Sequence, residues 1–255
     1  MVNAITNNRR IDGMGTQFQN IIYTYTYAVK NGYEFYYSPL TTMEHNYDND
    51  PDFIQKKEDV LNFKNNFTNY NPLLHTNCPV TVHNQLYNNI DKNIDMYFDK
   101  QMCEMINNIF WMNKDKKDYK DLDKINIGVH IRRHNKEDNR IEGTNVNINY
   151  FINCIDCLVN KNEDIFLKNK DYVINIYSQK GVEVDEIKKH NFKNVNYKVD
   201  YDANKSFIEM VASDILITSP SSFSYLAGLL CEGTVVYKPF WHPPKKDWLI
   251  INQQI

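Results

Sequence analysis

The second half of the chain alternates between short apolar runs and amphipathic stretches. From residue 125 onward, runs rich in Ile, Val and Tyr are separated by segments whose apolar residues recur every three or four positions. The runs predict buried strands and the segments between them predict helices. We expect strands over 125–133, 172–179, 195–200, 214–219 and 234–238, and helices over 149–160, 182–190, 206–212 and 222–230. This alternation indicates a parallel sheet with helices wound on both faces.

The first half of the chain has a less regular pattern. A segment with two glycines, 12–15, runs into an apolar stretch that predicts a helix ending at Gly32. A short strand is expected within 33–40, and a stripe of Ile, Phe and Met predicts a helix over 90–111. The polar and aromatic stretch 44–87 predicts no particular element.

A charged segment, 113–124, separates the two halves. It is almost wholly composed of charged and polar residues, which is typical of a linker between domains. We therefore expect two domains, an N-terminal one over 1–115 and a C-terminal one over 116–255.

Length and composition restrict the class of protein. The 255 residues are 42% hydrophobic and 24% charged, as in ordinary globular proteins. The net charge of −3 argues against a general nucleic-acid binder, which carries a basic excess. No stretch approaches the roughly 20 apolar residues of a transmembrane helix, and residues 1–11 lack the apolar centre of a secretory signal. We expect a cytoplasmic protein with no transmembrane segment.

The five cysteines predict neither disulfides nor a metal site. Their number is odd and their spacing is scattered, so reduced thiols are expected. Cys154 and Cys157 form a C-x-x-C, but the surrounding pattern is that of a helix that uses Cys as a small apolar residue. No second Cys or His pair at metal-ligand spacing accompanies it.

Arginine is scarce in this chain, and its positions are therefore informative. Only 5 of the 29 Lys and Arg residues are arginine, while 36 residues are Asn, a composition typical of AT-rich coding sequence. Where codon usage disfavours arginine, the arginines that remain are more often required. They form two clusters: Arg9 with Arg10, and Arg132, Arg133 and Arg140.

Two of the predicted strands end in residues that suit an anion. The first ends at His130, Arg132 and Arg133, and guanidinium groups pair bidentately with phosphate. The fourth runs through Ser221 and Ser222 into a helix, whose N-terminal N–H groups can bind phosphate. Taken singly, either serine is better explained as a helix cap. Together, at the carboxyl ends of strands in one sheet, the two features favour a phosphate-bearing ligand.

Three patches of the sequence resemble the fucosyltransferase superfamily, which includes α1,2-, α1,6- and protein O-fucosyltransferases. Residues 130–133 are similar to its H-x-R-R signature, 213–230 to its later donor motif, and 13–17 to its N-terminal G-x-G-N-Q loop. The patches stand in the family's order. The resemblance implies an α/β fold of the GT-B type with two Rossmann-like halves. The C-terminal half, a doubly wound parallel sheet, would bind the nucleotide sugar, and the N-terminal half would lie on the acceptor side.

The resemblance also implies roles for individual residues. Arg132 would bind the diphosphate and stabilise it as it leaves, and Arg133 is the weaker candidate because strand alternation points it the other way. His130 and Asp214 would contact the base, since a carboxylate that accepts from ring and exocyclic N–H groups selects guanine. The further residues implied are Ser221 and Ser222 at phosphate oxygens, Phe223 near the nucleotide, and Gly13 and Gly15, which would bring their loop close to the sugar and the acceptor.

The expected chemistry requires no metal ion or other cofactor. Cleavage of a sugar–diphosphate bond builds negative charge on the leaving oxygen, and fixed donors can offset that charge. Arg132 and the helix N-terminus would supply them, with inversion at the anomeric carbon. A general base is needed for the acceptor hydroxyl, and Asp12 is the candidate. An Asp before a Gly is also ordinary turn chemistry.

Three functions remain open from the sequence. The first, which we favour, is a transferase that moves fucose from GDP-fucose to a glycan or another hydroxyl acceptor. The second is a glycosyltransferase of the same fold with another sugar nucleotide as donor. The third is a non-catalytic module that binds a nucleotide or a sugar.

Overall fold

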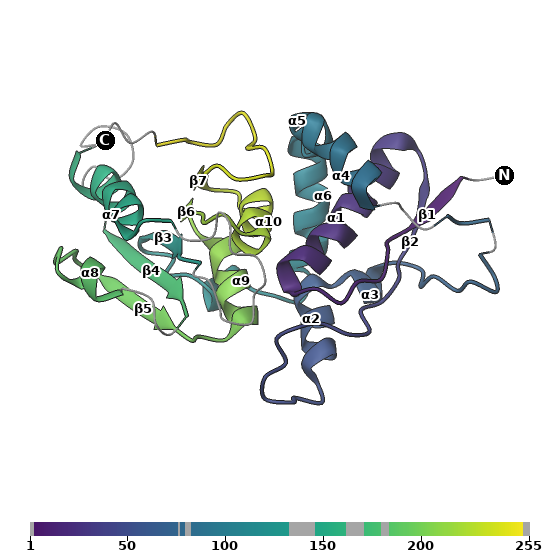
Figure 1. Ribbon diagram of the computed structural model, residues 1–255, viewed down its shortest axis with the longest axis horizontal. Helices are drawn as coiled ribbons and strands as arrows, with labels where there is room; N and C mark the ends of the chain where they lie inside the picture. The colour runs from purple at the N-terminus through teal and green to yellow at the C-terminus, as the bar shows by residue number, and fades with distance from the viewer. Residues whose placement is uncertain are drawn as a thin grey trace. The chain divides into compact units, whose positions relative to one another are not determined.

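The computed structural model describes residues 3–75, 77–79, 83–132, 146–161, 171–179 and 184–251. The chain forms two compact units, Met1–Lys114 and Asp115–Ile255, each with its own core (Figure 1). The boundary between the units lies inside the charged segment 113–124.

The first unit contains a parallel β–α–β motif. Strand β1 (Ala4–Thr6) leads into α1 (Met14–Asn31), and the chain returns to place β2 (Glu34–Tyr36) parallel to β1, with Ile5 opposite Phe35. Most side chains of α1 are buried, which makes it the central helix of this unit. The other helices are α2 (Phe53–Leu61), α3 (Phe63–Asn66), α4 (His83–Lys92), α5 (Ile94–Tyr97) and α6 (Lys100–Trp111).

The helices of this unit agree with the sequence prediction only in part. Helix α1 ends at Gly32 as predicted, and the φ of 70° at this glycine is that of a left-handed cap. It begins earlier than predicted, because Gly13 is its N-cap and Gly15 already lies in its first turn. The single helix expected over 90–111 is divided among the end of α4, α5 and α6. The Asp99 side chain accepts the Met102 N–H at 2.9 Å to begin α6.

The second unit is a five-stranded parallel sheet in the order β5-β4-β3-β6-β7. Every neighbouring pair runs parallel, as the alternation of strands and helices predicts. The strands are β3 (Ile125–His130), β4 (Tyr172–Ser178), β5 (Val195–Val199), β6 (Ile215–Ile217) and β7 (Thr234–Val236).

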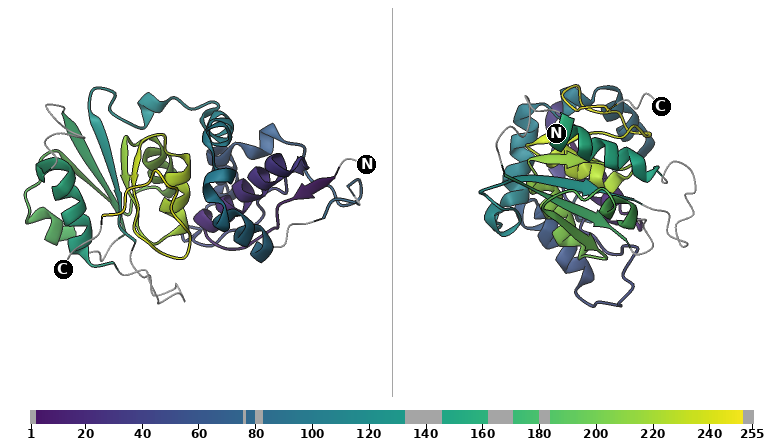
Figure 2. Two further views of the ribbon diagram at one scale, coloured as in Figure 1. Left: turned by 90° about the horizontal axis from the view of Figure 1, so that it is seen from above. Right: turned by 90° about the vertical axis from the view of Figure 1, so that its left-hand side faces the viewer.

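Helices cover both faces of this sheet, which confirms the doubly wound arrangement. Helices α7 and α8 lie on one face, and α9 and α10 on the other (Figures 1 and 2). Their bounds are α7 (Ile148–Asp156), α8 (Val184–Lys188), α9 (Ala203–Ala212) and α10 (Ser222–Leu230), with a short 3-10 helix η1 (Lys116–Asp118) before β3 and a π-helical turn η2 (Cys157–Lys161) after α7.

Strand β3 divides its side chains between the two helical layers. Ile127 and Val129 are fully buried in a core that includes the side chains of α7. Gly128 faces the opposite layer, because a Cβ added there would lie 2.6 Å from the Ser213 hydroxyl. Since side chains alternate along a strand, His130 shares the face of Gly128. The end of β3 thus directs the His130 side chain toward α10, where its ring contacts that of Phe223.

Cys154, the first cysteine of the C-x-x-C, is part of the core of the second unit. Cys154 is fully buried on α7, and burial raises the pKa of its thiol to about 12. A thiol with such a pKa stays protonated at neutral pH, so it packs as a small apolar side chain. Within the described ranges, no group of three or more His, Cys, Asp or Glu residues is arranged to hold a metal ion. Of the helices in those ranges, none is both long and apolar enough to cross a bilayer.

Candidate nucleotide-binding site

The order of the strands places a ligand site at the ends of β3 and β6. From β3 the chain moves outward through β4 and β5, then crosses to the other side of β3 and continues through β6 and β7. The direction of winding therefore reverses between β3 and β6. In open α/β sheets, ligands bind in the crevice beyond the carboxyl ends of the two strands at such a reversal. Val129 pairs with Ile217, so the segments that follow these two strands emerge side by side.

The hydroxyl of Ser219 connects these two segments. It donates to the His130 carbonyl oxygen at 2.5 Å and accepts the Arg132 N–H at 2.9 Å. Ser219 is fully buried, so both bonds are shielded from water. These bonds fix the backbone of 130–132 against the segment that leads into α10. The backbone position of Arg132 is therefore set by Ser219.

The N-terminus of α10 is the second component of the site. Ser221 is its N-cap, and its side chain accepts the Phe223 N–H at 3.3 Å. The first N–H groups of a helix have no partner within the helix and carry the positive end of its dipole. Ser221 and Ser222 are partly exposed, so this helix end is accessible to a ligand. The cap and the predicted phosphate contact thus fall on the same short segment.

His130 presents a neutral imidazole at this position. Its side chain is buried, and burial, together with the charge of Arg132, lowers its pKa to about 3. No described residue forms a hydrogen bond with its Nδ1. The ring lies 5.5 Å from that of Phe223, which in turn lies 5.4 Å from Phe207 on α9. A buried nitrogen without a partner, held between a strand end and an aromatic ring, is suited to a hydrogen bond with a ligand.

Arg132 lies at the ends of β3 and β4. One terminal nitrogen of its guanidinium donates to the Gln179 amide oxygen at 3.2 Å, and Gln179 directly follows β4. Gln179 therefore orients the arginine from the neighbouring strand. Arg133, the second arginine of the motif, lies outside the described residues.

Asp214 lies at the amino-terminal end of the paired strands β3 and β6, whereas His130 lies at the carboxyl end of β3. It precedes β6, and its carboxylate accepts the Asn126 N–H at 2.8 Å and the Lys120 ammonium at 2.7 Å. Asn126 stands four positions before His130 in β3, which is about 13 Å along a strand. The expectation that Asp214 and His130 contact one base is therefore wrong, because parallel strands place the start of β6 beside the start of β3.

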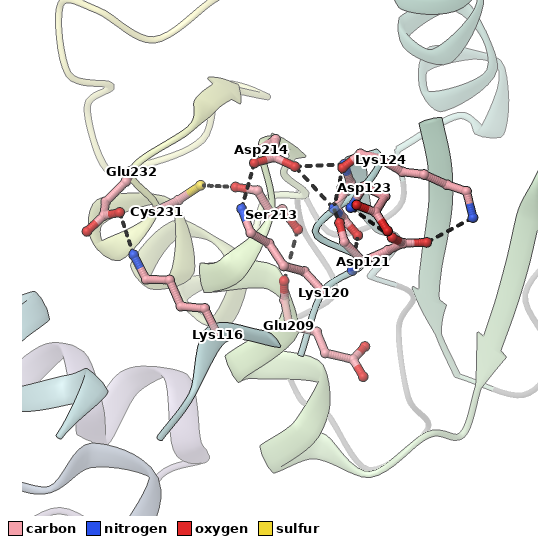
Figure 3. Close-up of polar contacts among 11 residues, drawn as sticks. Lys116, Lys120, Asp121, Asp123, Lys124, Glu209, Ser213, Asp214, Cys231 and Glu232 are labelled. Carbon is pink, nitrogen blue, oxygen red and sulfur yellow. Dashed lines mark hydrogen bonds and ion pairs between the residues drawn. The ribbon is translucent and has the colours of Figure 1, made fainter. Parts of the chain in front are cut away.

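The contacts of Asp214 indicate a structural role. Burial raises its pKa, but the hydrogen bonds from Asn126 and Lys120 more than compensate, and the pKa lies below the ordinary range of an aspartate. The ionised carboxylate ties the segment before β3 to the segment before β6. Figure 3 shows the neighbouring polar contacts, which include the ion pairs of Lys116 with Glu232 and of Lys124 with Asp121. These contacts also lie at the amino-terminal ends of the strands.

The predicted N-terminal residues lie in the first unit, around the start of α1. The Asp12 carboxylate pairs with the Arg10 guanidinium. The Gln17 amide donates to the Asp12 carbonyl oxygen at 2.7 Å and to that of Thr42 at 2.8 Å. The φ of Gly13 is −66°, an angle that any residue can adopt. A Cβ at this position would, however, lie 3.0 Å from the His45 ring. The glycine segment is thus a helix start packed against His45.

Sequence reasoning missed two residues of the site, Ser219 and Gln179. Each is the last residue of a predicted strand, which is the available signal, but neither has a residue type that indicates its partner. Their contacts depend on strands that lie side by side in the sheet and far apart in the chain.

No family model matches this sequence, and no curated protein sequence matches it. Among solved structures, the fold is similar to that of fucosyltransferase NodZ from Bradyrhizobium, at 11% identity and a TM-score of 0.46, covering 90% of this chain and 94% of that one. A NodZ α-1,6-fucosyltransferase co-crystallised with GDP is 12% identical, with a TM-score of 0.40 and coverages of 90% and 93%. A variant of Arabidopsis thaliana FUT1 in complex with GDP is 11% identical, with a TM-score of 0.45 and coverages of 94% and 72%. At these values the likeness concerns the fold alone.

Proposed function

We propose that this protein is a glycosyltransferase that takes its sugar from a nucleoside diphosphate sugar, with GDP-fucose as the donor. The observation that carries the proposal is the meeting of His130, Arg132 and the N-terminus of α10 where the strand order reverses. All three features belong to the second unit.

The diphosphate is the part of the donor that this site fits best. A pyrophosphate bears negative charge that a guanidinium can bind bidentately and that a helix N-terminus can bind through its N–H groups. Arg132 and the first turn of α10 would hold it from two sides. Ser219 supports this arrangement because it fixes both segments through hydrogen bonds.

The base would lie beside His130 and Phe223. The neutral imidazole can donate or accept one hydrogen bond without adding a charge, and the Phe223 ring offers an apolar surface for a purine. Because Asp214 lies at the amino-terminal ends of β3 and β6, it does not support a preference for guanine. That preference rests on the motif resemblance. The choice of fucose as the sugar rests on the same resemblance.

In the proposed reaction, the bond between the anomeric carbon and the β-phosphate oxygen breaks as the acceptor hydroxyl attacks the carbon. The electron pair of the broken bond goes to the phosphate oxygen, where Arg132 and α10 stabilise the added charge without a metal ion. Attack from the opposite side would invert the anomeric carbon. The hydroxyl proton goes to a general base, for which we propose Asp12.

Titration of the whole chain with a nucleotide panel tests the proposal. GDP, GDP-fucose, GDP-mannose, UDP-sugars and dTDP-sugars would each be added with EDTA and again with Mg²⁺, and the thermal midpoint would be followed. A ligand at 100 times its Kd stabilises by about 2.7 kcal/mol, which is readily detected. We expect stabilisation by GDP and GDP-fucose, unchanged by EDTA, and release of GDP from GDP-fucose on incubation with acceptors.

Other outcomes would point elsewhere. Stabilisation by UDP or dTDP compounds alone would refute the guanine donor and favour another sugar nucleotide. Stabilisation by GDP without transfer or hydrolysis of any GDP-sugar would favour a non-catalytic module. No response to any nucleotide would overturn the proposed site.

A further inference from the structure

A second basic residue follows the parallel sheet at the carboxyl end of β7. Lys238 stands two positions after this strand, just as Arg132 stands two positions after β3. Within the described ranges, no other Lys or Arg occurs in the first two positions after any strand of this sheet. In the strand order, β6 lies between β3 and β7. Arg132 and Lys238 therefore leave the sheet on either side of β6, the strand that leads into α10.

Two consecutive hydroxyl residues after β6 fix the backbone of both basic residues. The Arg132 N–H donates to the Ser219 hydroxyl at 2.9 Å. The Lys238 N–H donates to the hydroxyl of the preceding residue, Thr218, at 3.3 Å. Thr218 and Ser219 are both fully buried, and Ser221, two positions further on, is the N-cap of α10. The segment that becomes the helix N-terminus is thus bonded to the start of one cationic side chain on each side.

The surroundings of the Lys238 ammonium suit an anion. The ammonium lies 4.3 Å from the centre of the Tyr150 ring, and Tyr150 is buried in the first turn of α7. Among the described residues, no carboxylate forms an ion pair with it. The first turn of a helix carries the positive end of the helix dipole, which disfavours a cation nearby and favours an anion. The charge at the end of β7 is therefore placed where a negatively charged ligand would be stabilised.

A diphosphate needs more positive charge than Arg132 and α10 supply. Arg132 contributes one positive charge, and the N-terminus of a helix contributes about half of one. A nucleoside diphosphate sugar carries two ionised phosphate groups, and further negative charge develops on the leaving oxygen as the bond to the sugar breaks. Lysine binds phosphate as a point charge on a flexible stem. Lys238, on the other side of β6 from Arg132, would supply the remaining charge.

We infer that Lys238 is a second diphosphate-binding residue of the candidate site. It holds the phosphates from the side of β7, and Arg132 holds them from the side of β3. The four-carbon stem of Lys238 lets its ammonium turn from the Tyr150 ring to a phosphate oxygen, while the bond to Thr218 keeps its backbone in place. That the diphosphate belongs to a nucleotide sugar rests on the proposed function; that Lys238 binds an anion does not.

Calorimetric titration of the whole chain with inorganic pyrophosphate and with GDP, each at low and at high salt, tests this inference. Lys238→Met keeps the length of the stem and removes the charge, and we expect it to raise both Kd values about tenfold at low salt. The loss should shrink at high salt, where the charge is screened. Lys238→Arg should recover most of the affinity. The matched control is Lys188→Met on α8, because Lys188 also lies over a tyrosine ring, 5.4 Å from the centre of Tyr197, and its affinities should equal those of the wild type.

The outcomes separate this inference from the proposed function. Wild-type affinity for GDP in Lys238→Met, or a loss that Lys188→Met shares, would overturn the role of Lys238 and leave the donor site standing. A loss that is the same at high salt would show a packing role in place of a charge, and would overturn it too. Binding of pyrophosphate that Lys238→Met weakens, with no binding of GDP, would refute the nucleotide donor and leave Lys238 in an anion site. If the wild type binds neither probe, both proposals are wrong.

Discussion

The Ser219 hydroxyl lies 2.5 Å from the His130 carbonyl oxygen and 2.9 Å from the Arg132 amide nitrogen. One buried side chain thereby joins the carboxyl ends of β3 and β6, where the strand order reverses. The candidate site depends on this connection, because it fixes the backbone that carries both His130 and Arg132.

Replacement of Ser219 should destabilise the fold and weaken nucleotide binding together. Ser219→Ala removes the donor to a buried carbonyl and the acceptor of a nearby N–H, which costs about 1–3 kcal/mol. Ser222→Ala, at a partly exposed position of the same segment, should change the free energy of unfolding by less than about 0.5 kcal/mol. Urea unfolding of both variants measures this difference. Equal stability of the two would show that the bonds of Ser219 contribute nothing.

Arg132 should contribute to nucleotide affinity and little to stability. We expect Arg132→Ala to raise the Kd for GDP about tenfold or more, because a charge-assisted, bidentate contact is lost. Arg132→Lys should recover only part of the affinity, since an ammonium cannot form the paired bonds of a guanidinium. The control is Lys124→Ala, which removes a cation directly before β3, at the opposite end of this strand from Arg132. Calorimetric titration distinguishes the three, and wild-type affinity in Arg132→Ala would refute the assigned role.

His130 should make the fold sensitive to mild acid. Its pKa of about 3 means that the native imidazole stays neutral below pH 6.5, where the unfolded chain binds a proton. The unfolded state then holds more protons, so stability falls as the pH decreases, by at most about 1.4 kcal/mol per pH unit from this group. His130→Gln should remove that part of the decline between pH 6.5 and 5. Unfolding free energies at several pH values test this, and equal pH dependence in the wild type and His130→Gln would contradict it.

Asp214 should prove structural. Asp214→Asn keeps the size of the side chain but loses the ion pair with Lys120, and we expect a loss of about 1 kcal/mol in the free energy of unfolding at pH 7. The depressed pKa implies that the carboxylate's contribution is present above about pH 4 and is lost as the pH falls further. The preference among GDP, UDP and dTDP compounds should stay unchanged. A changed preference would restore Asp214 as a contact of the base.

The sequence by itself determined the elements of the second unit and their chemistry. Each predicted strand from residue 125 onward became a strand of the parallel sheet. The inner strands are mainly apolar because helices cover both of their faces. Gly32 ended its helix as predicted, since glycine adopts the left-handed angle there without the strain that a Cβ adds. The same reasoning placed His130 and Arg132 at the end of their strand and Ser221 at the start of a helix, all of which depend on local pattern.

Tertiary structure alone decided which of these residues meet. Asp214 precedes β6 and His130 ends β3, and the parallel pairing of these two strands puts the residues at opposite ends of the strands. The same pairing brings Ser219 to His130 across 89 residues of chain. In the first unit, the parallel pairing of β1 with β2 brings together Asn7 and Ser38, which exchange a reciprocal pair of hydrogen bonds. Local pattern determines helices and strands, whereas contacts between strand ends follow from strand order, which no single segment specifies.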